Sequence, residues 1–210
     1  MIDLYTASTF NGQRTSIMLE ETGLEYAAHR IDLAKGKQRQ QDFLQLNPSG
    51  RIPVIVDHDS GDGKPFVLTQ SVAIVQYLAE KSGQLLPESL TERARVYEWM
   101  QFHASDISSV LFNAFYLQRR IKPKQEQAAD QLRQRVHEIY QYFDQQLAEH
   151  EFLAGSTYSI ADITALPAVI AHEQKLSEYV NLTRWCQQLQ QRPAVQRGML
   201  VPQSEQSHES

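Results

Sequence analysis

The stretch from 47 to 82 constrains the fold of this sequence more than any other part of it. Residues 47–53 are rich in turn-forming types and lead directly into a β-branched strand candidate at 54–57. A cluster of Asp, Ser and Gly residues then separates this strand from a second apolar run at 65–69. Because two short strands joined by a turn pair with each other, the stretch predicts an antiparallel hairpin.

A helix is expected directly after this hairpin. From Ser71 onward the apolar side chains recur at three- and four-residue steps, and Gly83 stands where a helix would end. Gln70 and Ser71 therefore lie at the junction of strand and helix. A serine hydroxyl at the N-cap, beside free backbone amides and the positive end of the helix dipole, suits a carboxylate ligand. The simpler interpretation is that Ser71 only caps its own helix.

Pro53 stands at the start of an otherwise regular strand candidate. Proline cannot donate a backbone hydrogen bond, so it lies either at a sheet edge or after a cis peptide bond that turns the chain sharply. Such a turn would leave the backbone N–H and C=O of Ile52 free to pair with an extended ligand. The predicted substrate therefore has peptide character.

The residues before this stretch predict a strand, a helix, a second strand and a short helix. Residues 2–5 are a short strand candidate, and a hydroxyl-rich loop at 6–12 leads into a helical pattern. Residues 25–33 are the second strand candidate. A strand–helix–strand unit of this length implies a right-handed crossover and parallel pairing. The first eighty residues thus predict a βαβ unit, a short helix and a ββα unit.

The composition excludes several classes of function. The net charge of -5 at pH 7 gives no basic surface for a nucleic acid. No apolar stretch approaches ~20 residues and no signal peptide is recognisable, so we expect a cytoplasmic protein with no membrane partner. The single cysteine, Cys186, cannot form a disulfide, a CxxC pair or a cysteine zinc site within one chain. The histidine spacing does not indicate a metal site either.

Only helices are expected after residue 82. Residues 83–89 contain Gly and Pro, which predicts a linker. Helical patterns at 90–120 and 125–149, joined by a short connection, predict an antiparallel pair. A last helix is expected at 180–191.

A capping box is expected between these helices, at Ser159 and Asp162. In the helix that it begins, Pro167 should cause a kink unless packing compensates for the lost hydrogen bond. The predicted organisation is a domain at 1–82, a linker at 83–89, an all-helical domain at 90–201 and a disordered tail at 202–210.

These elements together resemble one known family, the cytosolic glutathione transferases, from Ile2 to about Pro193. The most specific parts of the resemblance are Asn47-Pro48-x-Gly50-x-Ile52-Pro53, Gln70-Ser71 before Ala73-Ile74-x-x-Tyr77-Leu78, and Ser159-Ile160-Ala161-Asp162 after Phe152-Leu153-Ala154-Gly155. The resemblance implies an α/β plus all-α fold. Its N-terminal domain would be thioredoxin-like (βαβ–ββα), and its C-terminal domain would be all-helical and line the second-substrate pocket.

Within the family the chain looks like the bacterial nu class, whose best-described members reduce disulfides with glutathione. The residues that carry this finer similarity are Tyr5-x-x-x-Thr9-x-Asn11-Gly12 and Asp32-Leu33-x-Lys35-Gly36-x-Gln38. The resemblance implies glutathione as co-substrate, a disulfide or a small electrophile as second substrate, no metal, and a homodimer.

The resemblance also implies roles for individual residues around glutathione. The backbone of Ile52, before Pro53, would pair with the cysteinyl unit, while Gln70 and Ser71 would hold the γ-glutamyl amine and carboxylate. Many classes have a glutamate where this chain has Gln70, and a neutral side chain accepts from an ammonium more weakly. Gln38 and Arg51 would face the glycyl carboxylate.

Thr9 and Asn11 lie where the resemblance places the glutathione sulfur. A thiol of pKa near 8.5 is mostly protonated at neutral pH, and each unit of depression requires ~1.4 kcal/mol of preferential stabilisation of the thiolate. A hydroxyl donor, an amide donor and a helix N-terminus together could supply one or two units. Tyr5 is the alternative donor, because some classes use a tyrosine at the end of this strand.

The sequence is compatible with three functions. Glutathione could reduce a disulfide, or it could be conjugated to an electrophile. In either case the attacking sulfur belongs to glutathione, because Cys186 lies among apolar neighbours in a late helix. The third possibility is a non-catalytic interaction module with the same fold, and the neutral Gln70 is the feature that favours it.

Overall fold

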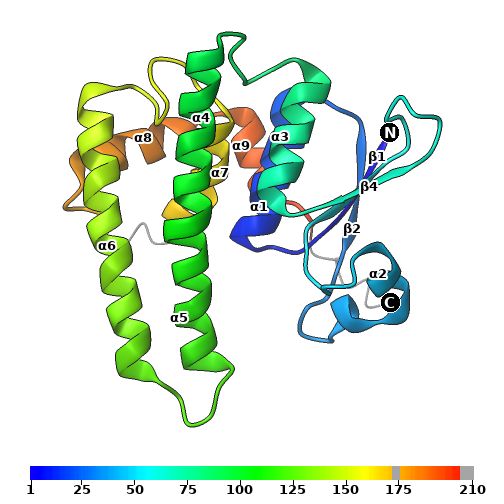
Figure 1. Ribbon diagram of the computed structural model, residues 1–210, viewed down its shortest axis with the longest axis horizontal. Coiled ribbons are helices and arrows are strands. Elements are labelled where there is room, and N and C mark those ends of the chain that lie inside the picture. The colour runs from blue at the N-terminus through cyan, green and yellow to red at the C-terminus, as the bar shows by residue number, and fades with distance from the viewer. Residues whose placement is uncertain (172–175, 204–210) are drawn as a thin grey trace, which may run out of the picture. The chain divides into compact units, whose positions relative to one another are not determined.

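The computed structural model describes residues 1–171 and 176–203. The chain forms two compact units. The first contains residues 1–84 and the described residues from 190 onward, and the second contains the described residues of 85–189. A mixed α/β unit and a helical unit are what the sequence predicts for the fold class (Figure 1).

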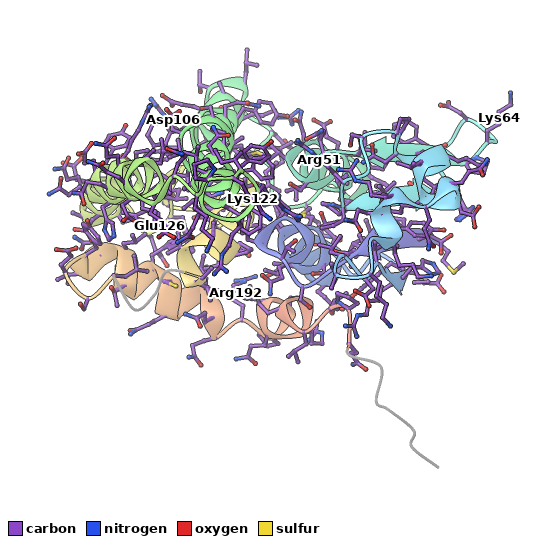
Figure 2. All side chains as sticks on the ribbon, turned by 90° about the horizontal axis from the view of Figure 1, so that it is seen from below. Arg51, Lys64, Asp106, Lys122, Glu126 and Arg192 are labelled. Atoms are coloured by element: carbon purple, nitrogen blue, oxygen red, sulfur yellow. The ribbon has the colours of Figure 1, made fainter. Side chains whose placement is uncertain are left out.

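A four-stranded sheet in the order β2-β1-β3-β4 organises the first unit. Its strands are β1 (Ile2–Thr6), β2 (Tyr26–Arg30), β3 (Val54–Asp57) and β4 (Phe66–Thr69). The predicted parallel pairing of β1 with β2 and the predicted β3–β4 hairpin are both confirmed. Lys64 lies on the loop that joins β3 to β4 and extends away from the sheet (Figure 2).

β2 is shorter than the predicted strand at 25–33, and the loop after it explains why. The carboxylate of Asp32 accepts hydrogen bonds from the backbone amides of Ala34 and Lys35, at 3.0 and 3.1 Å. This turn bends the chain away from the sheet soon after Arg30.

Helices α1 (Phe10–Thr22) and α3 (Ser71–Ser82) pack against each other in this unit. The short helices η1 (Lys37–Arg39) and α2 (Gln41–Leu46) lie between β2 and β3 in the chain. Along β1, Ile2, Leu4 and Thr6 are buried, whereas Asp3 and Tyr5 are partly exposed. Because strand side chains alternate between faces, Tyr5 lies on the opposite face of β1 from Leu4 and Thr6.

The C-terminus of α3 lies where the sequence predicts it, whereas the N-terminus differs from the prediction. Gly83 ends the helix in the left-handed conformation (φ 68°), and its amide donates to the carbonyl of Ala79. Gln70 is the N-cap, so the prediction that Ser71 caps the helix is wrong by one position. Ser71 is instead the first residue inside the helix, because Gln70 takes a left-handed φ of 70°.

The second unit consists of helices, with α5 and α6 side by side as predicted (Figure 1). Its elements are α4 (Leu90–Phe102), a π-helical segment η2 (His103–Ser108), α5 (Ser109–Arg119), α6 (Glu126–Glu149), α7 (Ile160–Ile170) and α8 (Val180–Gln190). The single helix expected at 90–120 is therefore interrupted by a π segment.

The predicted capping box is present at the start of α7. Asp162 accepts from the backbone amide of Ser159 at 3.0 Å, and the hydroxyl oxygen of Ser159 accepts from the amide of Ala161 at 3.3 Å. The same carboxylate also accepts from the indole Nε1 of Trp185 at 2.8 Å. α7 runs through the buried Pro167 as one helix.

The last described helix, α9 (Pro193–Met199), packs on α1 and belongs to the first unit. This division differs from the predicted helical domain at 90–201. A Cβ atom on Gly198 would lie 2.5 Å from the Cα of Ile17, so glycine permits the close approach. Arg192 adds a two-pronged ion pair with Glu21, at 2.7 and 2.8 Å. Most of the predicted tail at 202–210 lies outside the described residues.

Among the described residues, no helix combines the length and the apolar character needed to cross a membrane.

Candidate functional site

The strand register brings the ends of four strands together at one edge of the sheet. Thr6, at the end of β1, pairs with Arg30 at the end of β2. Tyr5 pairs with Val54, which begins β3, and Val54 pairs with Thr69, which ends β4. The segments that join these strand ends to the helices therefore all leave the sheet at the same edge.

Those segments, together with the first turns of α1 and α3, carry the residues that the sequence predicts for ligand binding or catalysis, apart from Tyr5 itself. The chain leaves β1 toward Thr9 and leaves β2 toward Gln38, and β4 is followed by Gln70 and Ser71. Residues 51–53 lead into β3. Figure 1 shows α1 and α3 beginning close to this edge.

Thr9 is the N-cap of α1, and its hydroxyl oxygen accepts a hydrogen bond from the amide of Gly12 at 3.2 Å. A hydroxyl that accepts this bond still has its own hydrogen to donate. Gly12 is required here for space. A Cβ atom on it would lie 2.2 Å from the carbonyl oxygen of Ala7 and 2.4 Å from Oγ1 of Thr6.

Asn11 lies in the first turn of α1 and is partly exposed. That turn contains no acidic residue, so the positive end of the helix dipole is not offset from within the turn. The Asn11 side-chain amide can therefore donate to an anion held near the start of α1.

The peptide bond between Ile52 and Pro53 is cis, which is one of the two arrangements that the sequence predicts. The turn before it is held by Asn47, whose side-chain amide donates to the carbonyl of Arg51 at 2.7 Å. Within residues 1–171 and 176–203, the amide and carbonyl of Ile52 have no backbone partner. Both groups can therefore pair with a ligand.

Gln38 comes close to this turn through Gly50. A Cβ atom on Gly50 would lie 2.9 Å from the carbonyl oxygen of Gln38 and 2.8 Å from Nη1 of Arg39, and Gly50 has φ of 61°. Arg39 also donates to the carbonyl of Ser49 at 3.3 Å, which joins η1 to the turn. The side-chain Oε1 of Gln38 is buried and has no hydrogen-bond partner in the described part of the chain.

Arg14 is a residue that the sequence analysis did not single out. Its Nη1 donates to the hydroxyl oxygen of Ser71 at 3.3 Å, which links α1 to the first turn of α3. The arginine is 1% exposed. A signal for it exists in the sequence, because position 14 falls on the same face of α1 as the buried residues Ile17 and Met18. A charged residue on a buried helix face is rarely there without a partner.

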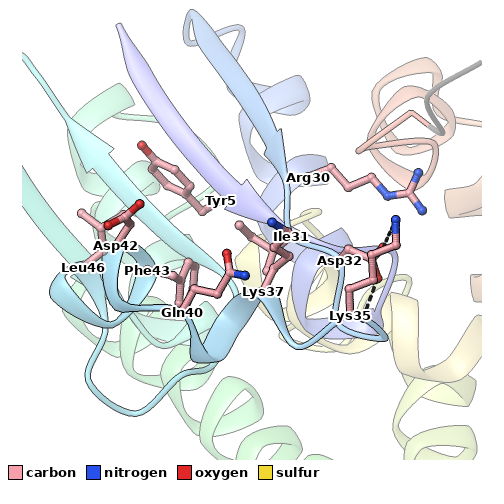
Figure 3. Close-up of a pocket in the computed structure, with 10 residues that line it drawn as sticks. All are labelled: Tyr5, Arg30, Ile31, Asp32, Lys35, Lys37, Gln40, Asp42, Phe43 and Leu46. Carbon is pink, nitrogen blue, oxygen red and sulfur yellow. Dashed lines mark hydrogen bonds and ion pairs between the residues drawn. The ribbon is translucent and has the colours of Figure 1, made fainter.

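Tyr5 lines a cavity of about 820 Å³ (Figure 3). In Figure 3 its ring lies on the side of Phe43 and Leu46, which come from α2. The ring stacks on His29, with centroids 4.7 Å apart. Burial raises the pKa of the phenol, and the charge of Asp3 raises it further, so the phenol is protonated at neutral pH.

The other end of this cavity is lined by charged side chains of the loop after β2, namely Arg30, Asp32 and Lys35 (Figure 3). The pKa of Asp32 is lowered, mainly by the hydrogen bond from the Lys35 amide. Its carboxylate also lies 3.7 Å from the ammonium of Lys35. In the described residues, no group of three or more His, Cys, Asp or Glu side chains could hold a metal ion.

Comparison with known proteins identifies the family. The glutathione S-transferase N-terminal domain model matches residues 11–81, and the C-terminal domain model matches residues 99–193. The chain is 33% identical over 207 residues to the disulfide-bond oxidoreductase YfcG of Escherichia coli K12, covering 97% of this chain and 96% of that protein. The chain belongs to the glutathione S-transferase family.

Solved structures of other glutathione transferases resemble this glutathione S-transferase over nearly its full length. A transferase from Burkholderia graminis, crystallised with two glutathione molecules per subunit, has a TM-score of 0.89 and 32% identity, covering 96% of this chain and 88% of that one. A transferase from Pseudomonas putida, crystallised with one glutathione disulfide per subunit, has a TM-score of 0.88 and 30% identity. It covers 96% of this chain and 91% of that one.

Proposed function

We propose that this glutathione S-transferase binds glutathione at the shared edge of the sheet and uses the glutathione thiolate to reduce disulfide bonds. The observation that carries the proposal is the Thr9 hydroxyl, whose oxygen accepts from Gly12 at 3.2 Å while its hydrogen remains to be donated. This donor lies at the N-terminus of α1, where an anion is stabilised by the helix dipole.

The peptide part of glutathione would pair with the backbone of Ile52. The unpaired amide and carbonyl of this residue, fixed before Pro53 by the bond from Asn47 to Arg51, can bind the cysteinyl unit as a neighbouring strand would. The cysteinyl sulfur would then lie toward Thr9 and Asn11, because the segment after β1 and the segment at 51–53 meet the sheet at the same edge.

The two ends of glutathione would be held by the remaining residues. The γ-glutamyl carboxylate would accept from the Ser71 hydroxyl and from the backbone amides at the start of α3, and its amine would face Gln70. The glycyl carboxylate would lie near Arg51 and the η1 segment that carries Gln38. Arg51 and η1 can lie close together because Gly50 has no side chain, which lets η1 approach the turn before Ile52.

The reaction balances with glutathione as the only source of electrons. The first glutathione thiolate attacks one sulfur of the substrate disulfide, forms a mixed disulfide with it and releases the other sulfur as a thiolate. A second glutathione thiolate attacks the glutathione sulfur of the mixed disulfide and releases the second substrate thiolate. The products are glutathione disulfide and two thiols.

No cysteine of the chain can take the role of the attacking sulfur. Cys186 is the single cysteine of the sequence and is buried, with 1% of its surface exposed. The two glutathione molecules in the Burkholderia relative support a reaction that uses a second glutathione.

An assay of two reactions tests the proposal. The protein is incubated with glutathione and one of two substrates, either the symmetric disulfide bis(2-hydroxyethyl) disulfide or an activated aryl halide. Faster turnover of the disulfide supports reduction, whereas turnover of the aryl halide alone would favour the conjugating alternative. Calorimetric titration without any heat of glutathione binding would contradict the proposal and favour a non-catalytic interaction module.

We also propose that the protein is a homodimer. Phe66 and Val67, which are neighbours on the edge strand β4, are 39% and 40% exposed. An edge strand that carries exposed apolar side chains is a surface that a partner subunit can cover. Sedimentation velocity at micromolar concentration tests this, and a single species of 24.1 kDa would contradict it.

A further inference from the structure

The cavity that Tyr5 lines has no part in the proposed glutathione site. None of the residues that we assign to glutathione lines it. Its walls come from β1, the loop after β2, η1 and α2, all within the first unit. Its volume of about 820 Å³ lies in the range of small-molecule sites, roughly 300–1,000 Å³. The cavity is therefore a second place where this unit can hold a small molecule.

The wall that α2 contributes is largely apolar. Phe43, which is only 5% exposed, and Leu46 face the cavity from α2, and Ile31 lines it from the loop after β2. The Tyr5 ring lies on the side of Phe43 and Leu46 (Figure 3). An aromatic ligand ring would bury apolar surface against these side chains and could pack against the two protein rings.

The end of the cavity that Arg30 lines carries an excess of positive charge. The Asp32 carboxylate at this end accepts from two backbone amides and lies 3.7 Å from the Lys35 ammonium, so these two charges offset each other. Two further lining cations, Arg30 and Lys37, form no ion pair with any described residue. A ligand carboxylate would find two unpaired cations here, and a guanidinium can bind it through two parallel hydrogen bonds.

The opposite end of the cavity carries a negative charge. Asp42 lies there, on the side of Tyr5 and Leu46 (Figure 3). Its side chain forms no hydrogen bond or ion pair within the described part of the chain. An ionised carboxylate can only accept hydrogen bonds, and it repels a second acid group. This end therefore favours a ligand group that donates.

We propose that this cavity binds a small aromatic acid that carries an amine or another hydrogen-bond donor at the end opposite its acid group. The acid group would pair with Arg30, and the ring would lie against Phe43 and Tyr5. The donor at the far end would bond to Asp42. This binding site is separate from the proposed glutathione site and does not depend on it.

Three compounds test the two ends of the cavity one at a time. The parent compound is 4-(4-aminophenyl)butanoate. The second compound, 4-phenylbutanoate, lacks only the amine, and the third, 4-(4-aminophenyl)butanamide, has a neutral amide in place of the acid. Their dissociation constants are measured by calorimetry with S-hexylglutathione at saturation, so that the proposed glutathione site is filled. For the wild-type protein we expect the parent to bind about tenfold more tightly than the amide and about fivefold more tightly than 4-phenylbutanoate.

Two variants each remove the partner of one ligand group. Arg30→Gln should lower the preference for the acid over the amide by about fivefold and leave the preference for the amine unchanged. Asp42→Ala should remove the preference for the amine and leave the preference for the acid. Lys64→Gln and Asp62→Ala are the matched controls, because they make the same changes of charge on the loop between β3 and β4, which does not line the cavity. In both controls the two preferences should stay at their wild-type values.

Several results would overturn the inference. If the wild type shows no saturable binding of the parent, or binds all three compounds alike, the inference fails whether or not the variants fold. It also fails if Arg30→Gln and Lys64→Gln have equal effects, or if S-hexylglutathione displaces the parent compound. None of these results affects the proposed function, which is tested by glutathione binding and disulfide turnover. A protein that does not bind glutathione would still show the predicted preferences among the three compounds.

Discussion

The amide of Gly12 donates to the hydroxyl oxygen of Thr9 at 3.2 Å, and this bond both begins α1 and fixes the role of the threonine. Because the oxygen already accepts, the hydroxyl hydrogen is directed to another acceptor. Gly12 fits at this position only because it has no side chain, since a Cβ atom on it would lie 2.2 Å from the carbonyl oxygen of Ala7. A local capping interaction therefore provides the donor that the proposed chemistry needs for a thiolate.

Thr9→Val should reduce the glutathione-dependent rate at pH 7 by about tenfold, because it removes one hydrogen bond to a charged sulfur. Loss of the N-cap should also lower the free energy of unfolding by about 1 kcal/mol. Thr9→Ser keeps the hydroxyl and should restore the rate. Thr22→Val is the matched control on the same helix, since the Thr22 hydroxyl donates to the helix carbonyls of Met18 and Leu19. An equal loss of rate in Thr22→Val would remove the special role of Thr9.

Tyr5→Phe should change the rate of disulfide reduction by less than about twofold. The Tyr5 phenol lines the cavity beside Phe43 of α2 and stacks on His29, so we assign the role of thiol donor to Thr9. The measurement is the same disulfide assay, run beside Thr9→Val. A large loss in Tyr5→Phe together with a small loss in Thr9→Val would reverse the assignment and make Tyr5 the thiol donor.

Gln70→Glu should tighten glutathione binding by several fold, because a carboxylate accepts from the γ-glutamyl ammonium more strongly than a neutral amide does. The gain should be absent with glutaryl-cysteinylglycine, which lacks the amine. Calorimetric titration with both ligands measures this difference. Weaker binding of glutathione to the glutamate variant would show that the amine does not lie at position 70.

Asp162 should make the protein less stable as pH rises. Burial raises the pKa of this carboxyl to about 6 in the folded state, against 3.8 for the ordinary group. The folded state therefore binds more protons between these values, and stability that is present below pH 3.8 is lost as pH rises through 6. The contribution of Asp162 to the free energy of unfolding should fall by about 3 kcal/mol over this pH range.

Urea unfolding from pH 4 to 7 of the wild type and of Asp162→Asn isolates this contribution. The asparagine variant keeps the shape of the side chain but does not titrate, so its free energy of unfolding should fall less over this range. Parallel curves for the two proteins would mean that the pKa of Asp162 is not raised in the folded state.

Local patterns were sufficient to predict several parts of the fold. The hairpin of β3 and β4, the end of α3 at Gly83 and the capping box at Ser159 each depend on a few neighbouring residues. The same is true of Pro53, for which turn chemistry left two choices and the structure has the cis form. Such features can be predicted because the residues that stabilise them are adjacent in the sequence.

Features that depend on distant residues could not be predicted in the same way. Arg14 is buried because α1 packs on α3, and its partner Ser71 is far away in the sequence. The place of α9 against α1 depends on the missing side chain of Gly198 and on ion pairs to Glu20 and Glu21. The helical pattern of 90–120 does not reveal its π segment, since one inserted residue changes the spacing only locally.

The central claim is that the protein stabilises the glutathione thiolate without a titrating group of its own, and the thiol pKa of bound glutathione tests it most directly. The ultraviolet absorbance of the thiolate, followed against pH with the protein in excess, measures that pKa. We predict a value about one to two units below that of free glutathione, with the depression reduced in Thr9→Val. A bound thiol that titrates at the same pH as free glutathione would contradict the account.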